Sequence, residues 1–281
     1  MNENSSPAGH NVKIIRSRYK QEMWVYDEPI GYNYQQKNKL IIRRTFAELN
    51  PDEKIKSLKK KRSQAQKQLW YIVRLVNANF SNRHYRNKVE YTDKFLTLTF
   101  NQPLKFANLK QTNHLFWLFI NRLRRYLRNF YRAELKYLAA WEIQPHSKRV
   151  HYHIILFDFP YITFKKLTRL WGNGYIYIEK IDKVNKDRRG AYIAKYLAKN
   201  VDNYNPDYYK VKHFFKSQNI REPDERRYLV DTDGLDPQVQ PGLVFSKEYQ
   251  QSRYNQQANK FYQIRVRYYV YRGALDKRKE P

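Results

Sequence analysis

The residues best suited to chemistry in this sequence are two histidines one residue apart. His151 and His153 lie in the stretch RVHYHIILF, residues 149–157, whose other residues are mostly apolar. Such residues are typical of a buried strand, and because strand side chains alternate between faces, both imidazoles point to the same face. Two neutral imidazoles side by side can hold a divalent cation. The alternative is that one histidine forms a hydrogen bond in a core and the other faces solvent.

An acidic residue comes within reach of the histidines if the preceding segment forms a hairpin with theirs. KYLAAWEIQ, residues 136–144, is typical of a strand, and the polar PHSKR that follows predicts a turn. A turn centred at 147–148 places Glu142 opposite His153 and diagonal to His151. All three side chains then lie on one face of the sheet.

One carboxylate and two imidazoles form a mixed oxygen and nitrogen ligand set. Such a set suits Mn²⁺ or Mg²⁺ when a phosphate oxygen completes the coordination shell. Gln144 lies on the same face and is the rival third ligand. Taken alone, Glu142 could equally be a surface carboxylate paired with one of the many basic residues.

A second group of reactive side chains lies in YIAKYLAK, residues 192–199. On a helix, Tyr192, Lys195, Tyr196 and Lys199 share one face. A phenol beside ammonium groups has its phenolate stabilised by positive charge, which makes it a better nucleophile. The alternative is an amphipathic helix whose tyrosine and lysine face is only solvated.

The elements that must position these residues mix strands and helices. The apolar patterns predict strands at 94–100, 136–144, 149–157, 175–181 and 262–272. They predict helices at 50–80, with Asn50 or Asp52 as cap, and at 112–134, 163–172 and 187–201. With at least one hairpin among them, the pattern favours an α+β fold with a mainly antiparallel sheet.

Charge indicates the class of partner. The chain has 281 residues and a net charge of +29, from 55 Lys and Arg against 26 Asp and Glu, and the excess is not confined to a tail. A surplus of this size is best tolerated beside a polyanion, so we expect nucleic acid, and the 26 tyrosines offer stacking faces for unpaired bases.

Several classes of protein are excluded. The absence of cysteine excludes disulfides, zinc–thiolate sites and thiol nucleophiles. No apolar run approaches the roughly 18 residues that span a bilayer, and the N-terminus has no secretory signal, so we expect a cytoplasmic protein without membrane contact. No Gly-rich Lys-Ser/Thr loop is present, so any helicase must be another protein.

Three stretches together resemble the motifs of a known family. FLTLTF, WEIQPHSKRVHYHIILF and YIAKYLAK, in this order, are similar to the three motifs of HUH-superfamily rolling-circle replication initiators (Rep). The likeness covers about residues 94–200 and is greatest to the two-tyrosine group of single-stranded DNA phages and plasmids. It implies a central, mainly antiparallel sheet of about five strands flanked by helices.

The resemblance also implies an activity. In that family the paired histidines and an acidic or amide residue bind Mn²⁺ or Mg²⁺, and a helix-borne tyrosine attacks the scissile phosphate of single-stranded origin DNA. The products are a 5′-phosphotyrosine link and a free 3′-OH, and the strands are rejoined at termination. By likeness to single-tyrosine relatives, Tyr196 ranks ahead of Tyr192 as first attacker, and Lys195 and Lys199 would neutralise charge on the phosphate.

These inferences give a division of the chain. We expect a disordered N-terminus at 1–12, a basic helical segment with a DNA contact at 13–90, the HUH endonuclease domain at 91–203, and an extension of unknown role at 204–281. Expected partners are single-stranded and origin DNA, a polymerase and a separate helicase of a bacterial or archaeal host. Two alternatives stay open, namely an HUH transposase or mobilisation relaxase, and a non-catalytic single-stranded nucleic-acid-binding protein.

Overall fold

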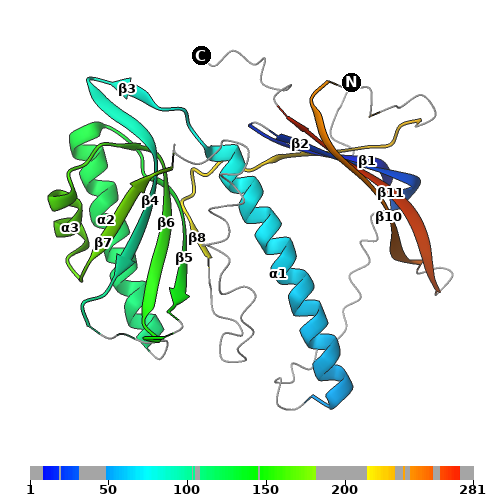
Figure 1. The fold of residues 1–281 in the computed structure, drawn as a ribbon, viewed down its shortest axis with the longest axis horizontal. Helices are drawn as coiled ribbons and strands as arrows, with labels where there is room; N and C mark the ends of the chain where they lie inside the picture. Colours follow the sequence, from blue (N-terminus) through cyan, green and yellow to red (C-terminus); the bar gives the residue numbers. More distant parts are fainter. Residues whose placement is uncertain are drawn as a thin grey trace. The chain divides into compact units, whose positions relative to one another are not determined.

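The chain divides into two compact units in a computed structural model. One unit consists of Met1–Arg43 together with Glu222–Pro281, and the other of Arg44–Arg221. Figure 1 shows the elements of both. The residues that the structure describes are 9–18, 20–31, 49–102, 104, 108–144, 146–181, 214–231, 237, 241–255 and 260–272.

The unit of Arg44–Arg221 carries an antiparallel sheet of six strands. In chain order these are β3 (His84–Arg86), β4 (Val89–Thr99), β5 (Lys136–Ile143), β6 (Val150–Pro160), β7 (Ile176–Lys180) and β8 (Phe214–Lys216). Their order across the sheet is β3-β4-β6-β5-β8, with β7 also paired to β4. The fold is thus α+β with an antiparallel sheet, as the sequence predicts, consistent with an HUH endonuclease-like fold.

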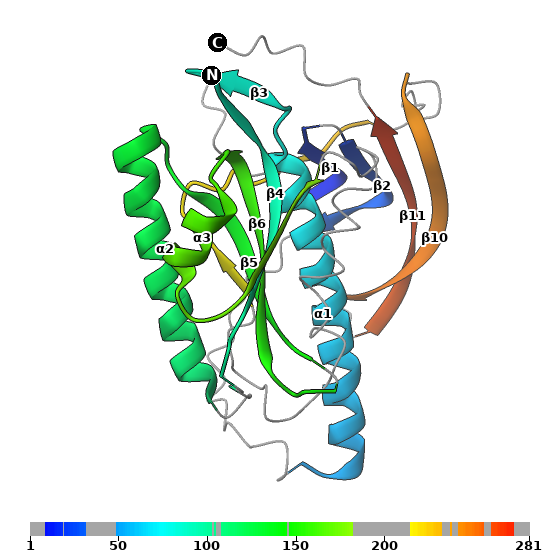
Figure 2. The same cartoon turned by 60° about the vertical axis from the view of Figure 1, so that its left-hand side comes forward.

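Two helices cover one face of this sheet, as Figures 1 and 2 show. α2 (Leu109–Tyr131) has apolar residues at helical spacing, and α3 (Phe164–Trp171) begins at the side-chain cap of Thr163. Phe119 of α2 and Trp171 of α3 lie fully buried in one cluster with Leu98 and Tyr152 of the strands. The main core of the unit therefore lies on this face, because alternate residues of β4, β5 and β6 point toward the helices.

The other face of the same sheet receives the end of α1 (Pro51–Asn79). Asn50 and Glu53 form a capping box at the start of α1, which confirms Asn50 as the cap. At the other end, Phe80 packs on Phe157 of β6 with ring centroids 6.1 Å apart, and Tyr71 contacts Lys216 of β8. The last turns of α1 therefore lie on the β8 side of this face.

The other unit has a five-stranded antiparallel sheet made from both ends of the chain. Its strands are β1 (Gly9–Ser17), β2 (Lys20–Gly31), β9 (Asp224–Tyr228), β10 (Leu243–Asn255) and β11 (Lys260–Arg272). The strand order is β10-β11-β2-β1-β9. The predicted strand at 262–272 is thus confirmed as β11, with residues from β1, β2 and β11 forming its apolar cluster.

This second sheet corrects three sequence expectations. The segment 13–90 is helical only within α1, because its first part forms β1 and β2. Gly9–Asn11, expected to be disordered, belong to β1. The segment 204–281 is not a single extension, since β8 joins the other sheet and the unit boundary falls at Arg221. Pairing between strands some 200 residues apart leaves no local sequence signal.

Candidate active site

The two histidines lie side by side in the middle of the six-stranded sheet. His151 of β6 is paired with Thr99 of β4 on one side and Glu142 of β5 on the other. His153 is paired with Thr97 and with Ala140 in the same way. Both imidazoles therefore point to the face opposite α2 and α3, as the strand alternation predicts.

The expected register of the hairpin was wrong by two residues. Glu142 lies opposite His151 and diagonal to His153, the reverse of the prediction. The cause is the turn: Gln144 N–H donates to Arg149 O (3.0 Å), and Lys148 adopts a left-handed conformation with φ 56°. Because side chains alternate with a period of two residues, this shift leaves Glu142 on the same face as the histidines.

Glu142 nevertheless contacts the histidine that lies diagonal to it. Its Oε2 atom is 2.6 Å from Nε2 of His153. Glu142, His151 and His153 are only 8%, 9% and 8% exposed, so a charge here must be paired inside the protein. The structure thus brings together the carboxylate and the two imidazoles that the sequence singles out.

Two threonines of β4 contact the opposite side of the imidazoles. Thr97 Oγ1 lies 3.1 Å from Nδ1 of His153, and Thr99 Oγ1 lies 3.5 Å from Nδ1 of His151. A partner on one ring nitrogen determines the tautomer and the ring orientation, which leaves the other nitrogen for a ligand. Sequence reasoning missed both threonines. The alternation in FLTLTF, which places them on one face of a strand, is the signal that could have found them.

Gln144, the rival third ligand, is held in the turn. Its side chain is exposed, and its Oε1 accepts a hydrogen bond of 2.6 Å from the Ser147 hydroxyl. Glu142 is therefore the side chain that contacts a histidine. Within the described parts of the chain, no group of three or more His, Asp or Glu side chains is already arranged to hold a metal ion.

The predicted nucleophile helix lies outside the described residues. Tyr192, Lys195, Tyr196 and Lys199 all fall in the range 182–213. Their roles stay predictions from the sequence.

Residues 93–201 match a family model. The model describes a replication-associated protein family, that of ORF2 and gene 2 protein. The match supports a replication initiator, Rep, and with it DNA binding and a role in DNA replication. The chain matches no curated protein and no solved structure.

The matched range contains every candidate site residue. It begins within β4, includes the hairpin of β5 and β6, and extends past Lys199. The five-stranded unit, by contrast, lies outside the match. None of the helices that the structure describes has the length and apolar character needed to cross a membrane.

Proposed function

We propose that the protein initiates rolling-circle replication by nicking single-stranded origin DNA and later rejoining the strands. The observation that carries this proposal is the meeting of Glu142, His151 and His153 on one sheet face inside the range that matches a replication-associated family. A protein that only binds nucleic acid has no use for a buried carboxylate beside two imidazoles.

A divalent cation fits this donor set. Two ligands about 2.1 Å from one ion lie roughly 3 Å apart, so Glu142 Oε2 and His153 Nε2, now 2.6 Å apart, need separate only slightly to admit it. Glu142, His151 and His153 would hold Mn²⁺ or Mg²⁺, with Thr97 accepting from Nδ1–H of His153. The ion would polarise the scissile phosphate.

The reaction is a phosphodiester exchange in this proposal. The phenolate oxygen of Tyr196 or Tyr192 attacks phosphorus, the bond from phosphorus to the 3′-oxygen breaks, and that oxygen leaves as a 3′-OH after taking up a proton. Lys195 and Lys199 stabilise the negative charge that develops. The 5′-phosphotyrosine link conserves the energy of the broken bond, so rejoining needs no ATP.

The free 3′-OH defines the partners of the proposed reaction. A polymerase extends it, and a separate helicase opens the duplex ahead. With two tyrosines, one can hold a 5′ end while the other attacks a second site.

Covalent capture tests the proposal. The full-length protein is incubated with a randomised single-stranded DNA pool and Mn²⁺, denatured, and the DNA that stays attached is sequenced. We expect one preferred sequence, attached through Tyr192 or Tyr196 as mass spectrometry would show. The adduct should vanish with EDTA and in the His151→Ala, His153→Ala double variant. No adduct from the wild type, together with retained DNA binding, would favour a non-catalytic binding protein.

A further inference from the structure

Two tyrosines at β7 lie in the same cross-strand rows as the histidines. Tyr177 is paired with Thr97, which is paired with His153. Tyr175 exchanges both backbone hydrogen bonds with Thr99, at 2.9 and 3.0 Å, and Thr99 is paired with His151. Since directly paired residues point to the same face, both tyrosines lie on the face of the candidate site, about two strand spacings or roughly 10 Å from the histidines.

These tyrosines differ from the histidines in exposure. Tyr175 is 74% exposed and Tyr177 is 59% exposed, although they belong to the same sheet. Large aromatic side chains on an edge strand usually pack under a helix or loop, because an exposed apolar edge favours aggregation. The two rings instead present their surface to solvent beside a buried polar site.

The strand that carries them is held firmly at both ends. Before Tyr175, the Trp171 indole donates to Thr99 O (3.1 Å), and Gly174 lies so close to β4 that a Cβ there would overlap the same carbonyl oxygen. After Tyr177, the Lys180 ammonium donates to both oxygens of Glu90 on β4, at 2.9 and 3.0 Å. The two tyrosines therefore lie on a fixed support.

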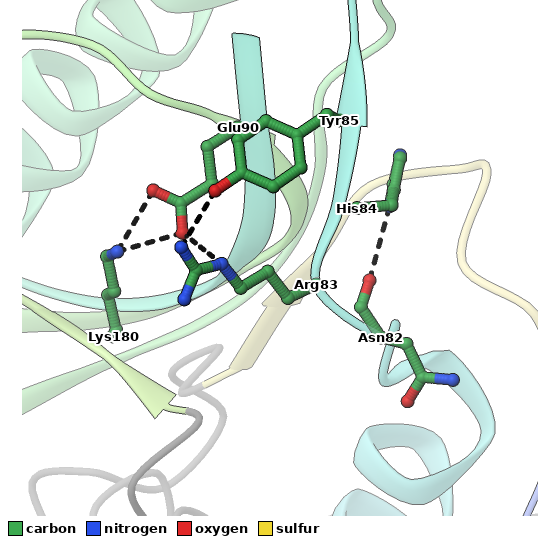
Figure 3. A network of polar contacts seen from close by, with 6 residues as sticks. All are labelled: Asn82, Arg83, His84, Tyr85, Glu90 and Lys180. Carbon is green, nitrogen blue, oxygen red and sulfur yellow. Dashed lines mark hydrogen bonds and ion pairs between the residues drawn. The ribbon is translucent and has the colours of Figure 1, made fainter. Parts of the chain in front are cut away.

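Figure 3 shows that Glu90 also joins this support to the segment that leads into β3. Arg83 Nε lies 2.8 Å from Glu90 Oε1, and the Arg83 guanidinium also donates to the hydroxyl of Tyr85. The hydrogen bond from Lys180 lowers the pKa of Glu90, so this carboxylate stays ionised and paired at neutral pH. A polyanion is thus offered cations beside the strand, while Tyr177 is oriented by its own hydrogen bond to Glu179 (3.2 Å).

The opposite end of the rows is less open to a substrate. On the β8 side, Lys216 contacts the Tyr71 ring and hydroxyl of α1, and Phe80 lies on Phe157. Among the described strands, β7 pairs with β4 alone. A strand of DNA that reaches the histidines along the sheet therefore has its open approach over β7.

We propose that Tyr175 and Tyr177 form a stacking subsite for unpaired bases next to the phosphate bound at the histidines. The inference rests on the proposed function and names how its substrate is held. A distance of roughly 10 Å is spanned by about two or three nucleotides of a single strand. Duplex bases are already stacked on each other, so the subsite selects single-stranded DNA, and it tolerates any base because each has a π face.

The test measures the affinity of the full-length protein in EDTA for a labelled single-stranded 20-mer of mixed sequence and for the same sequence as a duplex. Stacking on two rings predicts a loss of about 10- to 100-fold in single-strand affinity for the Tyr175→Ala, Tyr177→Ala double variant. Duplex affinity should be unchanged, and so should the salt dependence, because no phosphate contact is removed. Tyr→Phe and Tyr→Trp at both positions should restore binding.

The matched control removes two equally exposed rings elsewhere. Phe130 lies near the end of α2 and Tyr161 precedes α3, and they are 69% and 55% exposed. Their double alanine variant should bind both DNA forms like the wild type. As a measurement on the unaltered protein, a strand with 5-iododeoxyuridine should photocrosslink to Tyr175 or Tyr177.

Two results would overturn the subsite: full single-strand affinity in the double alanine variant, or equal losses for single strand and duplex. Crosslinks confined to other residues would do the same if the alanine variant fails to fold. The failure of the proposed function looks different, because it gives no covalent adduct with Mn²⁺ in the wild type while the tyrosine dependence of single-strand binding persists.

Discussion

The Nε2 atom of His153 lies 2.6 Å from Oε2 of Glu142, although the residue paired with His153 across the strands is Ala140. The diagonal contact leaves Glu142 directly beside His151 as well. One carboxylate can therefore serve both imidazoles, which is the arrangement that a shared cation requires.

We expect Glu142→Ala to weaken Mn²⁺ binding at least tenfold, because even the loss of an outer-shell partner typically has such an effect. Isothermal titration of the metal-free protein measures it. The control is Glu134→Ala, which removes an exposed carboxylate paired with Arg128. Equal Mn²⁺ affinity in the two variants would contradict the assignment of Glu142 as a ligand.

Thr97→Val should reduce metal affinity more than Thr99→Val, since its hydroxyl is closer to an imidazole Nδ1 atom, at 3.1 against 3.5 Å. The two substitutions are isosteric and lie on one strand, so each is the control of the other. Nitrogen-15 NMR of the histidine rings with Mg²⁺ reports the tautomer directly. We expect Nδ1–H of His153 in the wild type and a mixture of tautomers in Thr97→Val. Unchanged ring signals would remove the orienting role.

Gly174→Ala should destabilise the protein by several kcal/mol, because the new Cβ would overlap the carbonyl of Thr99 and the backbone has φ +151°. Gly172→Ala is the matched control, since Gly172 has φ +69° and its Cβ would meet only Arg169 O at 3.6 Å. Here we expect a loss of about 1–2 kcal/mol from the left-handed conformation alone. Urea unfolding measures both, and equal losses would show that the close approach to β4 is unimportant.

Asp93 should make stability depend on pH. It is buried, and desolvation raises its pKa to about 6, although it accepts hydrogen bonds from Ser81 and from Asp158 N–H. Between roughly pH 4 and 6 the folded state binds a proton that the unfolded state has lost. The free energy of unfolding therefore falls as pH rises through this window, by on the order of 2 kcal/mol, and levels off above it.

Asp93→Asn should remove that fall, and the difference between variant and wild type in urea unfolding at about pH 4 to 7 isolates it from the titration of other groups. Glu134→Gln, which changes an exposed carboxylate, should keep the wild-type profile. A wild-type slope that persists in Asp93→Asn would assign the dependence to a different residue.

The two tyrosines of YIAKYLAK should contribute unequally to the first cleavage. We expect Tyr196→Phe to weaken nicking more than Tyr192→Phe, and either change to impair closure of a circle, because transfer needs a second nucleophile once the first holds DNA. The double variant should form no adduct. Gel and mass-spectrometric counts of adduct and rejoined product on one nick-site oligonucleotide decide the matter, and closure at wild-type level in both single variants would leave the pair without a purpose.

The histidine-bearing sheet could be predicted from the sequence because its signals are local. The apolar alternation around His151 and the helical period of α2 each extend over a single element, and the structure has both. The register could not be predicted, since it depends on the left-handed conformation of Lys148 in a turn without glycine. The error did little harm because a shift of two residues preserves the face.

Two parts of the molecule had no such local signal. The threonine contacts were missed because they join β4 to β6, and Thr97 and His153 are 56 residues apart in the sequence. The five-stranded sheet was missed because β2 pairs with β11 from the far end of the chain. Both depend on which strands become neighbours, and the hydrophobic pattern of a single strand does not specify its neighbours.

The construction of one sheet from both ends of the chain sets the order in which the protein can mature during synthesis. All strands of the histidine-bearing unit lie within Arg44–Arg221 and can pair before the last strands have been translated. The hairpin of β1 and β2 is made first on the ribosome, yet the edge of β2 waits for β11 at Lys260–Arg272. A nascent chain that is interrupted after Arg221 would therefore carry a finished histidine site and an unpaired, aggregation-prone strand edge, a form that cellular quality control can remove.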